Sequence, residues 1–385
     1  MGTGQNHFPS CGSGQKPHHF IIKEVRKMLG LDRAAVWVDL EVDADLVIIG
    51  IKKYFKNVQP KKLSGRTQTF LISEKNINEI RVREKPLKTM IKIDFSYSRY
   101  NKKDNLYPLT SEIAKVLAEE EIVDIINKIS LSHITRGNLK YEYLEICIQE
   151  NVKSFYDYHN VISLFYKSLS RNFKTFEKTR FENYDVAGDY FYSTGFIFQL
   201  DTGWKMRLYS KSHEHNKKHP GESLHPILRL EHRVTSGILK KWCSTKMVKD
   251  FTIEFLKNEI VKQMGHNLVI FLEQEIDRDI EFLEDKFKDF TSRTLRTLVR
   301  DYQEHILDEK IVNYVVMKLS NKSDTQKRRY RKIVKTSLEE FQARGSPKRN
   351  NFNNIKRLEF FIRQILLVDI GVKCNYDEHL TFNIT

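Results

Sequence analysis

The sequence predicts an α+β protein with an N-terminal winged helix-turn-helix, a central, mostly antiparallel sheet with packed helices, and a C-terminal helical region. Three observations lead to this prediction. Short helix patterns and a basic hairpin pattern fill residues 19–85. Between residues 90 and 245, strand-like segments of alternating apolar and polar residues are interspersed with amphipathic helices. From residue 246 onward, apolar residues recur at the spacing of packed helices.

Residues 1–18 are rich in Gly, Ser, His and Pro, and we expect a disordered leader there. In the unit 19–85, a helix that ends at Gly30 precedes a second helix opened by Asp32, and a basic turn (QPKKLSGRTQ), a short strand (TFLI) and a last helical turn follow. This order is typical of a winged helix-turn-helix that binds DNA. A small helical cap without DNA contact is the alternative. The expected DNA contacts are Arg33, Lys61, Lys62 and Arg66.

The central unit covers residues 90–245. The segments MIKIDFSYSRY, KYEYLEICIQ and GFIFQL alternate apolar and polar residues, so we expect strands there. Amphipathic helices are expected at LTSEIAKVLAEEEIVDIINKI and SFYDYHNVISLFYKSLSRNF. Strands and helices in this order indicate a domain built on one mostly antiparallel sheet.

The C-terminal unit, residues 246–385, is expected to be helical and basic. Its run KRRYRK at residues 327–332 concentrates positive charge around one aromatic residue, a pattern that suits a nucleic-acid backbone. A solvated helix face explains the run equally well. The expected DNA contacts in this unit are Arg328, Arg329 and Arg331.

The charge of the chain points to a polyanionic partner. Its 385 residues carry 65 Lys and Arg against 50 Asp and Glu, a net charge of +15, and nucleic acid is the commonest polyanion. An ordinary basic protein is the other interpretation. The four scattered cysteines contain no CxxC pair and favour a reducing cytoplasm, and no apolar run is long enough to cross a membrane. We therefore expect a cytoplasmic protein without a membrane partner.

The segment WKMRLYSKSHE, residues 204–214, contains the most informative tyrosine. On a strand, Lys205, Arg207 and Tyr209 share one face, and a helix that begins next would place Lys211 and Glu214 one turn apart. Cations at such positions favour a phenolate or grip a phosphate, so Tyr209 is a candidate nucleophile. The alternative is a tyrosine packed at a sheet edge.

Four residues on or just after strand-like segments are candidate metal ligands. Carboxylates in the middle of strands are unfavourable unless they are paired or bound to metal, and Mg²⁺ or Mn²⁺ prefers oxygen donors, with Mn²⁺ also accepting imidazole. The candidates are Glu145, His159, Asp185 and Glu231. His213 and His215 have the spacing of a metal pair, but a flexible polar turn is the preferred interpretation of their segment.

Four segments in order resemble the gene II type replication initiators of filamentous phages, and related rolling-circle initiators are also similar. The segments are MIKIDFSYSRY, YEYLEICIQENVKSFYDYHNVI, KMRLYSKSHE and ILRLEHRVTSGILKKW. The resemblance spans residues 90–245, with a looser helical continuation. It places the nucleophile on Tyr209, the lysine and acid of that motif on Lys211 and Glu214, and the strand acid on Glu231. Tyr190 and Tyr192 are the alternative nucleophiles.

The resemblance implies an enzyme that nicks one strand of an origin, stays attached to the 5′ phosphate and later rejoins the strand. It implies a divalent metal, Mg²⁺ or Mn²⁺, and double- and single-stranded origin DNA as partners, with a host helicase as a further candidate. Lys205 and Arg207 would contact that DNA. The main alternative is a non-catalytic, sequence-specific plasmid or phage regulator, and a conjugative relaxase would share the nicking chemistry.

Overall fold

The computed structural model describes most of the chain from residue 28 to residue 384. The described ranges are 28–74, 76–102, 106–153, 158–173, 183–185, 191–193, 195–219, 224–320, 323–344, 354–373 and 381–384. The leader expected over residues 1–18 lies outside them. Among the described residues, no helix is both long enough and apolar enough to cross a membrane.

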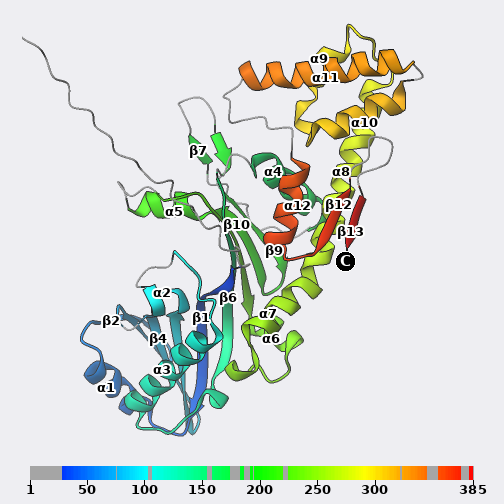
Figure 1. The fold of residues 1–385 in the computed structure, drawn as a ribbon. Helices are drawn as coiled ribbons and strands as arrows, with labels where there is room; N and C mark the ends of the chain where they lie inside the picture. The colour runs from blue at the N-terminus through cyan, green and yellow to red at the C-terminus, as the bar shows by residue number, and fades with distance from the viewer. Residues whose placement is uncertain are drawn as a thin grey trace, which may run out of the picture.

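One antiparallel sheet of nine strands organises the first two thirds of the chain (Figure 1). Its spatial order is β2-β3-β4-β5-β1-β6-β11-β10-β9, and every neighbouring pair is antiparallel. The strands are β1 (Met28–Leu40), β2 (Val58–Ser64), β3 (Thr67–Ile72), β4 (Ile77–Lys85), β5 (Lys88–Ser96), β6 (Lys140–Asn151), β9 (Gly195–Asp201), β10 (Trp204–Ser210) and β11 (Ile227–Thr235). The predicted antiparallel sheet is therefore confirmed. The strands expected at MIKIDFSYSRY, KYEYLEICIQ and GFIFQL form, except that the end of MIKIDFSYSRY lies in the helix α2 (Tyr97–Lys102).

The prediction of a winged helix-turn-helix over residues 19–85 is wrong for the part that the structure describes. The segment expected to form its second helix lies in β1, which pairs with both β5 and β6 in the middle of the sheet. Ala34, Val36 and Val38 alternate along β1 and are buried, and β-branched valines favour that pleated setting over a helix. The segment expected to form a helical turn after Ser73 continues into strand β4. The basic hairpin does form, as β2 and β3 at the edge of the large sheet.

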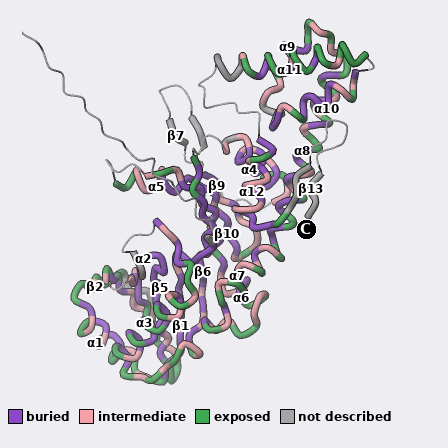
Figure 2. Tube along the Cα trace, viewed as in Figure 1, coloured by how far each residue is buried: buried purple, intermediate pink, exposed green. Residues whose placement is uncertain are grey.

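The helices in the first two thirds of the chain are α1 (Ala44–Tyr54), α2 (Tyr97–Lys102), α3 (Glu112–Ser130), α4 (His159–Asn172), α5 (Lys211–Lys218) and α6 (Ser236–Trp242). The backbones of α1 and α3 approach closely at Gly50. A Cβ added there would lie 2.0 Å from the carbonyl oxygen of Ile129, so only glycine fits. On α4, Phe165 packs against Phe196 of β9 with ring centroids 5.9 Å apart. The helices α1, α3, α4 and α6 pack buried apolar residues against the apolar face of the sheet, whereas α2 and α5 contribute residues to the other face. Figure 2 shows the sheet's central strands buried.

The C-terminal third is largely helical, as predicted. Its helices are α7 (Ile253–Ile260), α8 (His266–Phe287), α9 (Leu295–Asp301), α10 (Glu309–Leu319), α11 (Asp324–Arg344) and α12 (Ile355–Gln364). In Figure 1, α8 runs away from the sheet, and α9, α10 and α11 gather at its far end. A short hairpin of β12 (Ile370–Lys373) and β13 (Thr381–Ile384) was not predicted. A further small pair, β7 (Asn183–Asp185) and β8 (Phe191–Ser193), stands apart from the main sheet.

Side chains alternate between the two faces of the main sheet, and this separates core from site. In β11, Leu228, Leu230 and Val234 are buried toward the helices. The residues between them, Arg229, Glu231 and Arg233, belong to the opposite face. That polar face holds the candidate functional site.

Candidate functional site

Tyr209 lies near the end of β10, with only 2% of its surface exposed. Its hydroxyl donates a hydrogen bond to Oε2 of Glu231 on the neighbouring strand β11, at 3.1 Å. Strand register explains the contact, because Arg207 is opposite Glu231 and Tyr209 is opposite Arg229, which makes Tyr209 and Glu231 diagonal neighbours on one face. The phenol is therefore buried, but its oxygen faces a carboxylate and not apolar side chains.

The two side chains line a polar cavity of about 230 Å³ on that face. The strands β1, β6, β11 and β10 are adjacent in the sheet, so residues far apart in the sequence meet there. The lining residues are Asp32, Arg33, Asn78, Ser96, Arg99, Glu145, Arg207, Tyr209, Lys211, Glu214 and Glu231. Four carboxylates and four cations share this space, a balance that suits a phosphodiester together with a metal ion.

Two cations flank the tyrosine ring. The guanidinium carbon of Arg207 lies 4.0 Å from the centroid of the Tyr209 ring, and Nζ of Lys211 lies 5.9 Å from it. Burial, followed by the negative charge of Glu231, nevertheless raises the pKa of Tyr209 well above 10. The phenol is thus protonated at neutral pH, and a nucleophilic Tyr209 needs a base to take its proton. Lys205, two residues before Arg207 on the same face of β10, is exposed and does not line the cavity.

The carboxylates Glu145 and Glu231 interact unfavourably across the cavity. Burial and the charge of Glu231 raise the pKa of Glu145 to about 8. Burial and the charge of Asp32 likewise raise the pKa of Glu231. Buried carboxylates this close are stable only when a proton or a cation offsets their charge.

Asp32 completes the acidic group, and the sequence did not indicate this. Ligand atoms of Asp32, Cys147 and Glu231 all lie within 4.8 Å of one another. Burial raises the pKa of the Cys147 thiol, so this sulfur stays protonated and is a poor ligand. Asp32 reaches the cavity because β1 shifts register against β6 between Leu31 and Ala34. An acid expected to open a helix instead belongs to an irregularity in a central strand.

Arg229 is a second residue of the candidate site that the sequence did not reveal. Its side chain is fully buried beside Tyr209 on β11. The guanidinium donates to Oδ2 of Asp32 at 3.3 Å, to Oε1 of Gln149 and to the backbone oxygen of Leu106. Arg229 therefore fixes the Asp32 carboxylate from beneath the cavity. The only sequence signal was an arginine between two leucines, which is ordinary for a strand.

Lys211 and Glu214 lie together where β10 passes into α5. Nζ of Lys211 donates to Oε2 of Glu214 at 2.7 Å, and Lys211, ahead of Lys218, holds the pKa of Glu214 down at about 2 against the effect of burial. The Ser210 side chain caps the helix by accepting from the His213 backbone N–H. The expected flexible turn at His213 and His215 is therefore wrong, because both histidines lie in α5.

The predicted ligands His159 and Asp185 belong to α4 and β7, two elements that contribute no residue to the described lining of the cavity. His159 begins α4, which packs on the opposite, apolar face of the sheet. Asp185 ends β7, which pairs only with β8 among the described strands. The side chains of both residues lie outside the described part of the structure, as does that of Tyr192 on β8, and Tyr190 lies outside it altogether.

The predicted DNA contacts of the N-terminal segment are spread along the sheet. Nε of Arg33 donates to Oδ1 of Asp94 at 2.7 Å, and Arg33 lines the tyrosine cavity. Nζ of Lys61 on β2 lies 3.5 Å from Oε2 of Glu79. Arg66 is exposed in the β2–β3 turn, and the Lys62 side chain is not described.

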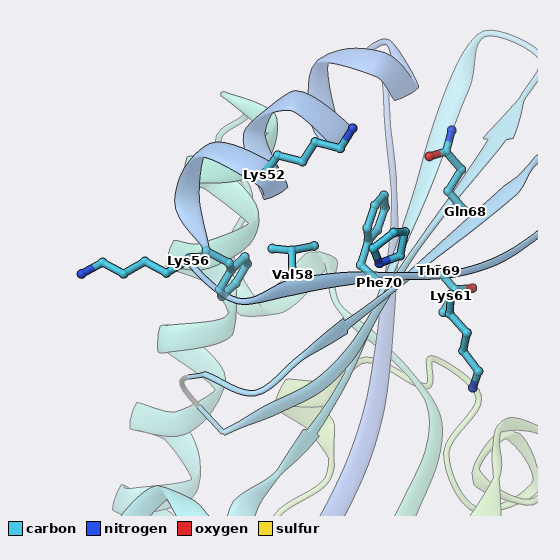
Figure 3. A pocket seen from close by; sticks show the side chains of 9 residues that line it. Lys52, Lys56, Val58, Lys61, Gln68, Thr69 and Phe70 are labelled. Carbon is cyan, nitrogen blue, oxygen red and sulfur yellow. The ribbon is translucent and has the colours of Figure 1, made fainter.

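A hollow of about 490 Å³ opens between α1 and the β2–β3 hairpin (Figure 3). Lys52 of α1 and Lys56, two residues after the end of α1, line this hollow together with the buried Phe55 and Phe70. In Figure 3, Lys61 extends away from Lys52 and Lys56. Lys61 therefore belongs more to the polar face of the sheet than to this hollow.

The predicted basic patch in the C-terminal unit lies on α11. Arg328, Arg329 and Arg331 are exposed, whereas Tyr330 between them is buried and packs edge-on against Phe290, with centroids 5.0 Å apart. The patch is thus a charged helix face with an aromatic anchor in the core. Both interpretations of the sequence fit this arrangement.

Comparison with known proteins finds distant structural likenesses only. No family model matches the chain, and no curated protein matches its sequence. A rolling circle replication initiator protein from Geobacillus stearothermophilus is similar over 56% of this chain and 80% of its own, with 12% identity and a TM-score of 0.30. The di-domain ARO/CYC BexL from the BE-7585A biosynthetic pathway is similar over 63% of this chain and 98% of its own, with 7% identity and a TM-score of 0.19. With TM-scores this low, neither structure contributes to the assignment of a function.

Proposed function

We propose that this protein is a rolling-circle replication initiator, a divalent-metal-dependent DNA nickase that cuts one strand with Tyr209 and later rejoins it. The observation that carries the proposal is the hydrogen bond from the Tyr209 hydroxyl to Glu231 inside a cavity lined by carboxylates and cations. A nucleophile, a base within 3.1 Å and groups for a phosphate are the parts that phosphodiester transfer needs.

The pKa values of the nucleophile Tyr209 and of the base Glu231 are both raised. The pKa of Tyr209 lies well above 10, and the pKa of Glu231 is raised from its ordinary range by burial. Glu231 is thereby a stronger base than an exposed carboxylate, and it already accepts the phenol's hydrogen bond. As the bond from Tyr209 Oη to phosphorus forms, the phenol proton passes to Glu231. The bond from phosphorus to the 3′ oxygen breaks, and that oxygen leaves with a proton from water.

The cations around Tyr209 suit a phosphate. Arg207 lies over the tyrosine ring, and Arg33, Arg99 and Lys211 line the same cavity. Guanidinium groups bind phosphate oxygens in a bidentate manner and stay charged at every relevant pH. These groups would hold the scissile phosphate against the phenol oxygen and balance the charge that builds up on it.

The donor set in the cavity fits Mg²⁺ or Mn²⁺. Three carboxylates, Asp32, Glu145 and Glu231, line one space, and hard divalent ions prefer carboxylate oxygens. Burial, followed by the negative charge of Glu231, raises the pKa of Glu145 to about 8, and a bound cation would offset both effects. When bound, the ion would draw negative charge from a phosphate oxygen. Asp32 and Glu145 would hold it, with Arg229 keeping Asp32 in place, while Glu231 takes the phenol proton.

The covalent intermediate gives a direct test. The full chain is incubated with Mn²⁺ and an end-labelled pool of random single-stranded DNA, and label that stays on the protein in denaturing gels is measured. We expect an adduct with the wild type and none with Tyr209→Phe, because the phenylalanine has no attacking oxygen. Tyr190→Phe and Tyr192→Phe are the matched controls and should form the adduct. An adduct with Tyr209→Phe, or none with the wild type, would refute the proposal.

A further inference from the structure

A second cavity adjoins the tyrosine cavity on the same face of the sheet. Its volume is about 490 Å³, inside the range of about 300–1,000 Å³ that small-molecule sites occupy. Arg33 lines both cavities. The lining residues are Arg33, Glu79, Arg81, Lys92, Asp94, Glu142, Tyr143, Arg233, Thr235 and Ser236.

Strand register places the second cavity beside the first. Arg233 of β11 is opposite Glu145 of β6, and its Nη1 lies 3.3 Å from Oε1 of that carboxylate, which belongs to the tyrosine cavity. The guanidinium of Arg233 also lies 4.1 Å from the centroid of the Tyr143 ring in the second cavity. On the far side, Arg81 of β4 is opposite Lys92 of β5. The two cavities therefore form one path across the strands.

Each carboxylate of the second cavity is paired with a cation of the same cavity. These carboxylates therefore hold the cations in position. Glu79 accepts from Arg81, and Glu142 lies 2.6 Å from Nζ of Lys92. Asp94 accepts from Arg33, from Nδ2 of Asn78 at 3.0 Å and from the hydroxyl of Tyr143. With Glu145, which pairs with Arg233, and Lys61, which pairs with Glu79, five cations face four carboxylates, and the excess positive charge favours an anionic ligand.

The path continues toward the edge of the sheet. Lys61 on β2 lies 3.5 Å from Glu79, the acid that also holds Arg81. Arg81 and Lys61 are about half exposed, at 44% and 57% of their side chains, so both can reach a ligand on the surface. Cations thus follow one another from the tyrosine cavity to the outermost strand. A chain of phosphates, and not a single anion, matches such a row.

We propose that the second cavity is a subsite for single-stranded DNA, which holds the nucleotide next to the phosphate in the tyrosine cavity. The proposal rests on the nickase function proposed for Tyr209. Arg33 would contact the phosphate between the two cavities, and Arg81 and Lys92 would contact the next phosphate along the strand. The neighbouring carboxylates hold these cations in position.

Binding measured without cleavage tests the subsite. In the Tyr209→Phe background, fluorescence anisotropy follows a labelled random single strand of about 20 nucleotides, longer than the sites of about 4–16 nucleotides of known single-strand modules. Arg81→Ala should weaken binding several-fold, and it should reduce the slope of log affinity against log salt by about 0.7, the value for one lost phosphate contact. Arg81→Lys keeps the charge and should bind nearly as well as the parent.

Arg363→Ala is the matched control. Arg363 on α12 is 42% exposed and lies 3.1 Å from Glu359, much as Arg81 is half exposed beside Glu79, but α12 is not on the polar face. This control should leave affinity and salt slope unchanged. Thermal unfolding of each variant separates loss of the subsite from loss of the fold.

Adduct formation with Tyr209 intact separates the two proposals. Arg81→Ala should require more DNA for half-maximal adduct formation while the rate at saturation stays near wild type. If the adduct forms but Arg81→Ala binds DNA with the parent's affinity and salt slope, the subsite is refuted and the nickase stands. If Arg81→Ala weakens binding but wild type never forms an adduct, the nickase is refuted and only a DNA-binding face remains.

Discussion

The hydroxyl of Tyr209 and the carboxylate of Glu231 lie 3.1 Å apart, diagonally across two antiparallel strands. The contact depends on register alone, since a shift of one residue in β10 would turn the phenol to the apolar face. Neither residue is near the other in the sequence, yet both are held by the most regular part of the sheet. A nucleophile and base placed on rigid strands keep their geometry without help from loops.

Glu231→Gln should nearly abolish adduct formation while leaving DNA binding intact. The amide keeps the shape of the carboxylate, but it cannot take the phenol proton. General base catalysis typically contributes about 10²–10⁴-fold, so we expect a rate loss of at least that size. The measurement is the rate of denaturation-resistant adduct formation at saturating DNA. A rate within a few-fold of wild type would show that Glu231 is not the base.

Gly195→Ala should damage the site from the neighbouring strand β9. A Cβ at Gly195 would lie 2.6 Å from Cβ of Tyr209 and 2.7 Å from the backbone oxygen of Leu208, so β9 and β10 must move apart. Misplacing a reacting group by about 1 Å can cost about 100-fold in rate, and overpacking costs about 1–3 kcal/mol of stability. Adduct formation and urea unfolding measure the two effects. Gly137→Ala, where the nearest atom would be 3.5 Å away, should change neither.

Without metal, the protein should become less stable as the pH rises from about 4.5 to about 8. The pKa of Glu145 is about 8 in the folded protein and near 4.5 when unfolded, so the folded state holds a proton that the unfolded state has lost. Stability therefore falls with increasing pH across that window. Glu145→Gln should flatten this part of the curve, which thermal unfolding at a series of pH values would measure. An unchanged slope in Glu145→Gln would contradict the assignment.

Mn²⁺ should raise the unfolding temperature more at pH 8.5 than at pH 6. At the lower pH a proton occupies the Glu145–Glu231 pair and competes with the ion, whereas at the higher pH the free carboxylates favour it. Asp32→Asn and Glu145→Gln should each remove most of the difference. An equal Mn²⁺ effect in these variants would place any metal elsewhere.

Glu119→Ala should destabilise the protein without affecting the chemistry directly. Glu119 is fully buried and accepts from the hydroxyls of Tyr97 and Tyr141, each at 2.8 Å, and from Lys115 and Arg136. Removing one partner of a buried ion pair costs about 3–5 kcal/mol, because the remaining charge is left in the core. Urea unfolding measures the loss. In Glu254→Ala, which removes an exposed pair, the loss should stay below about 1 kcal/mol.

Much of the central sheet was predictable because its strands alternate strictly. KYEYLEICIQ, GFIFQL, WKMRLYS and ILRLEHRV all form strands as expected, since each must bury one face against helices. Helix-cap signals gave the wrong prediction for β1, where Gly30 and Asp32 resemble the end of one helix and the start of the next. Local signals for helix caps are weak, and the pairing of β1 with a strand on each side outweighed them.

The individual side chains of the candidate site were predictable only in part. Tyr209, Lys211, Glu214, Glu145 and Glu231 were expected, because polar residues in the middle or at the end of strands stand out in a sequence. Asp32 and Arg229 were not expected. His159 and Asp185 were expected as metal ligands, and their side chains lie outside the described part of the structure. Which acids share a cavity depends on strand order and on one irregularity in β1, and neither is encoded locally.

By itself, the sequence determined the basic character of the protein, its central antiparallel strands, its helical C-terminal region and the tyrosine with cations on one strand face. These properties follow from composition and from periodicities of two and about 3.6 residues, which neighbours in the chain are enough to set. Only the tertiary structure decided that the N-terminal segment joins the same sheet and supplies Asp32 and Arg33 to the tyrosine. Pairing between distant strands selects such partners, because it is the burial of whole strands, and not local preference, that fixes their order.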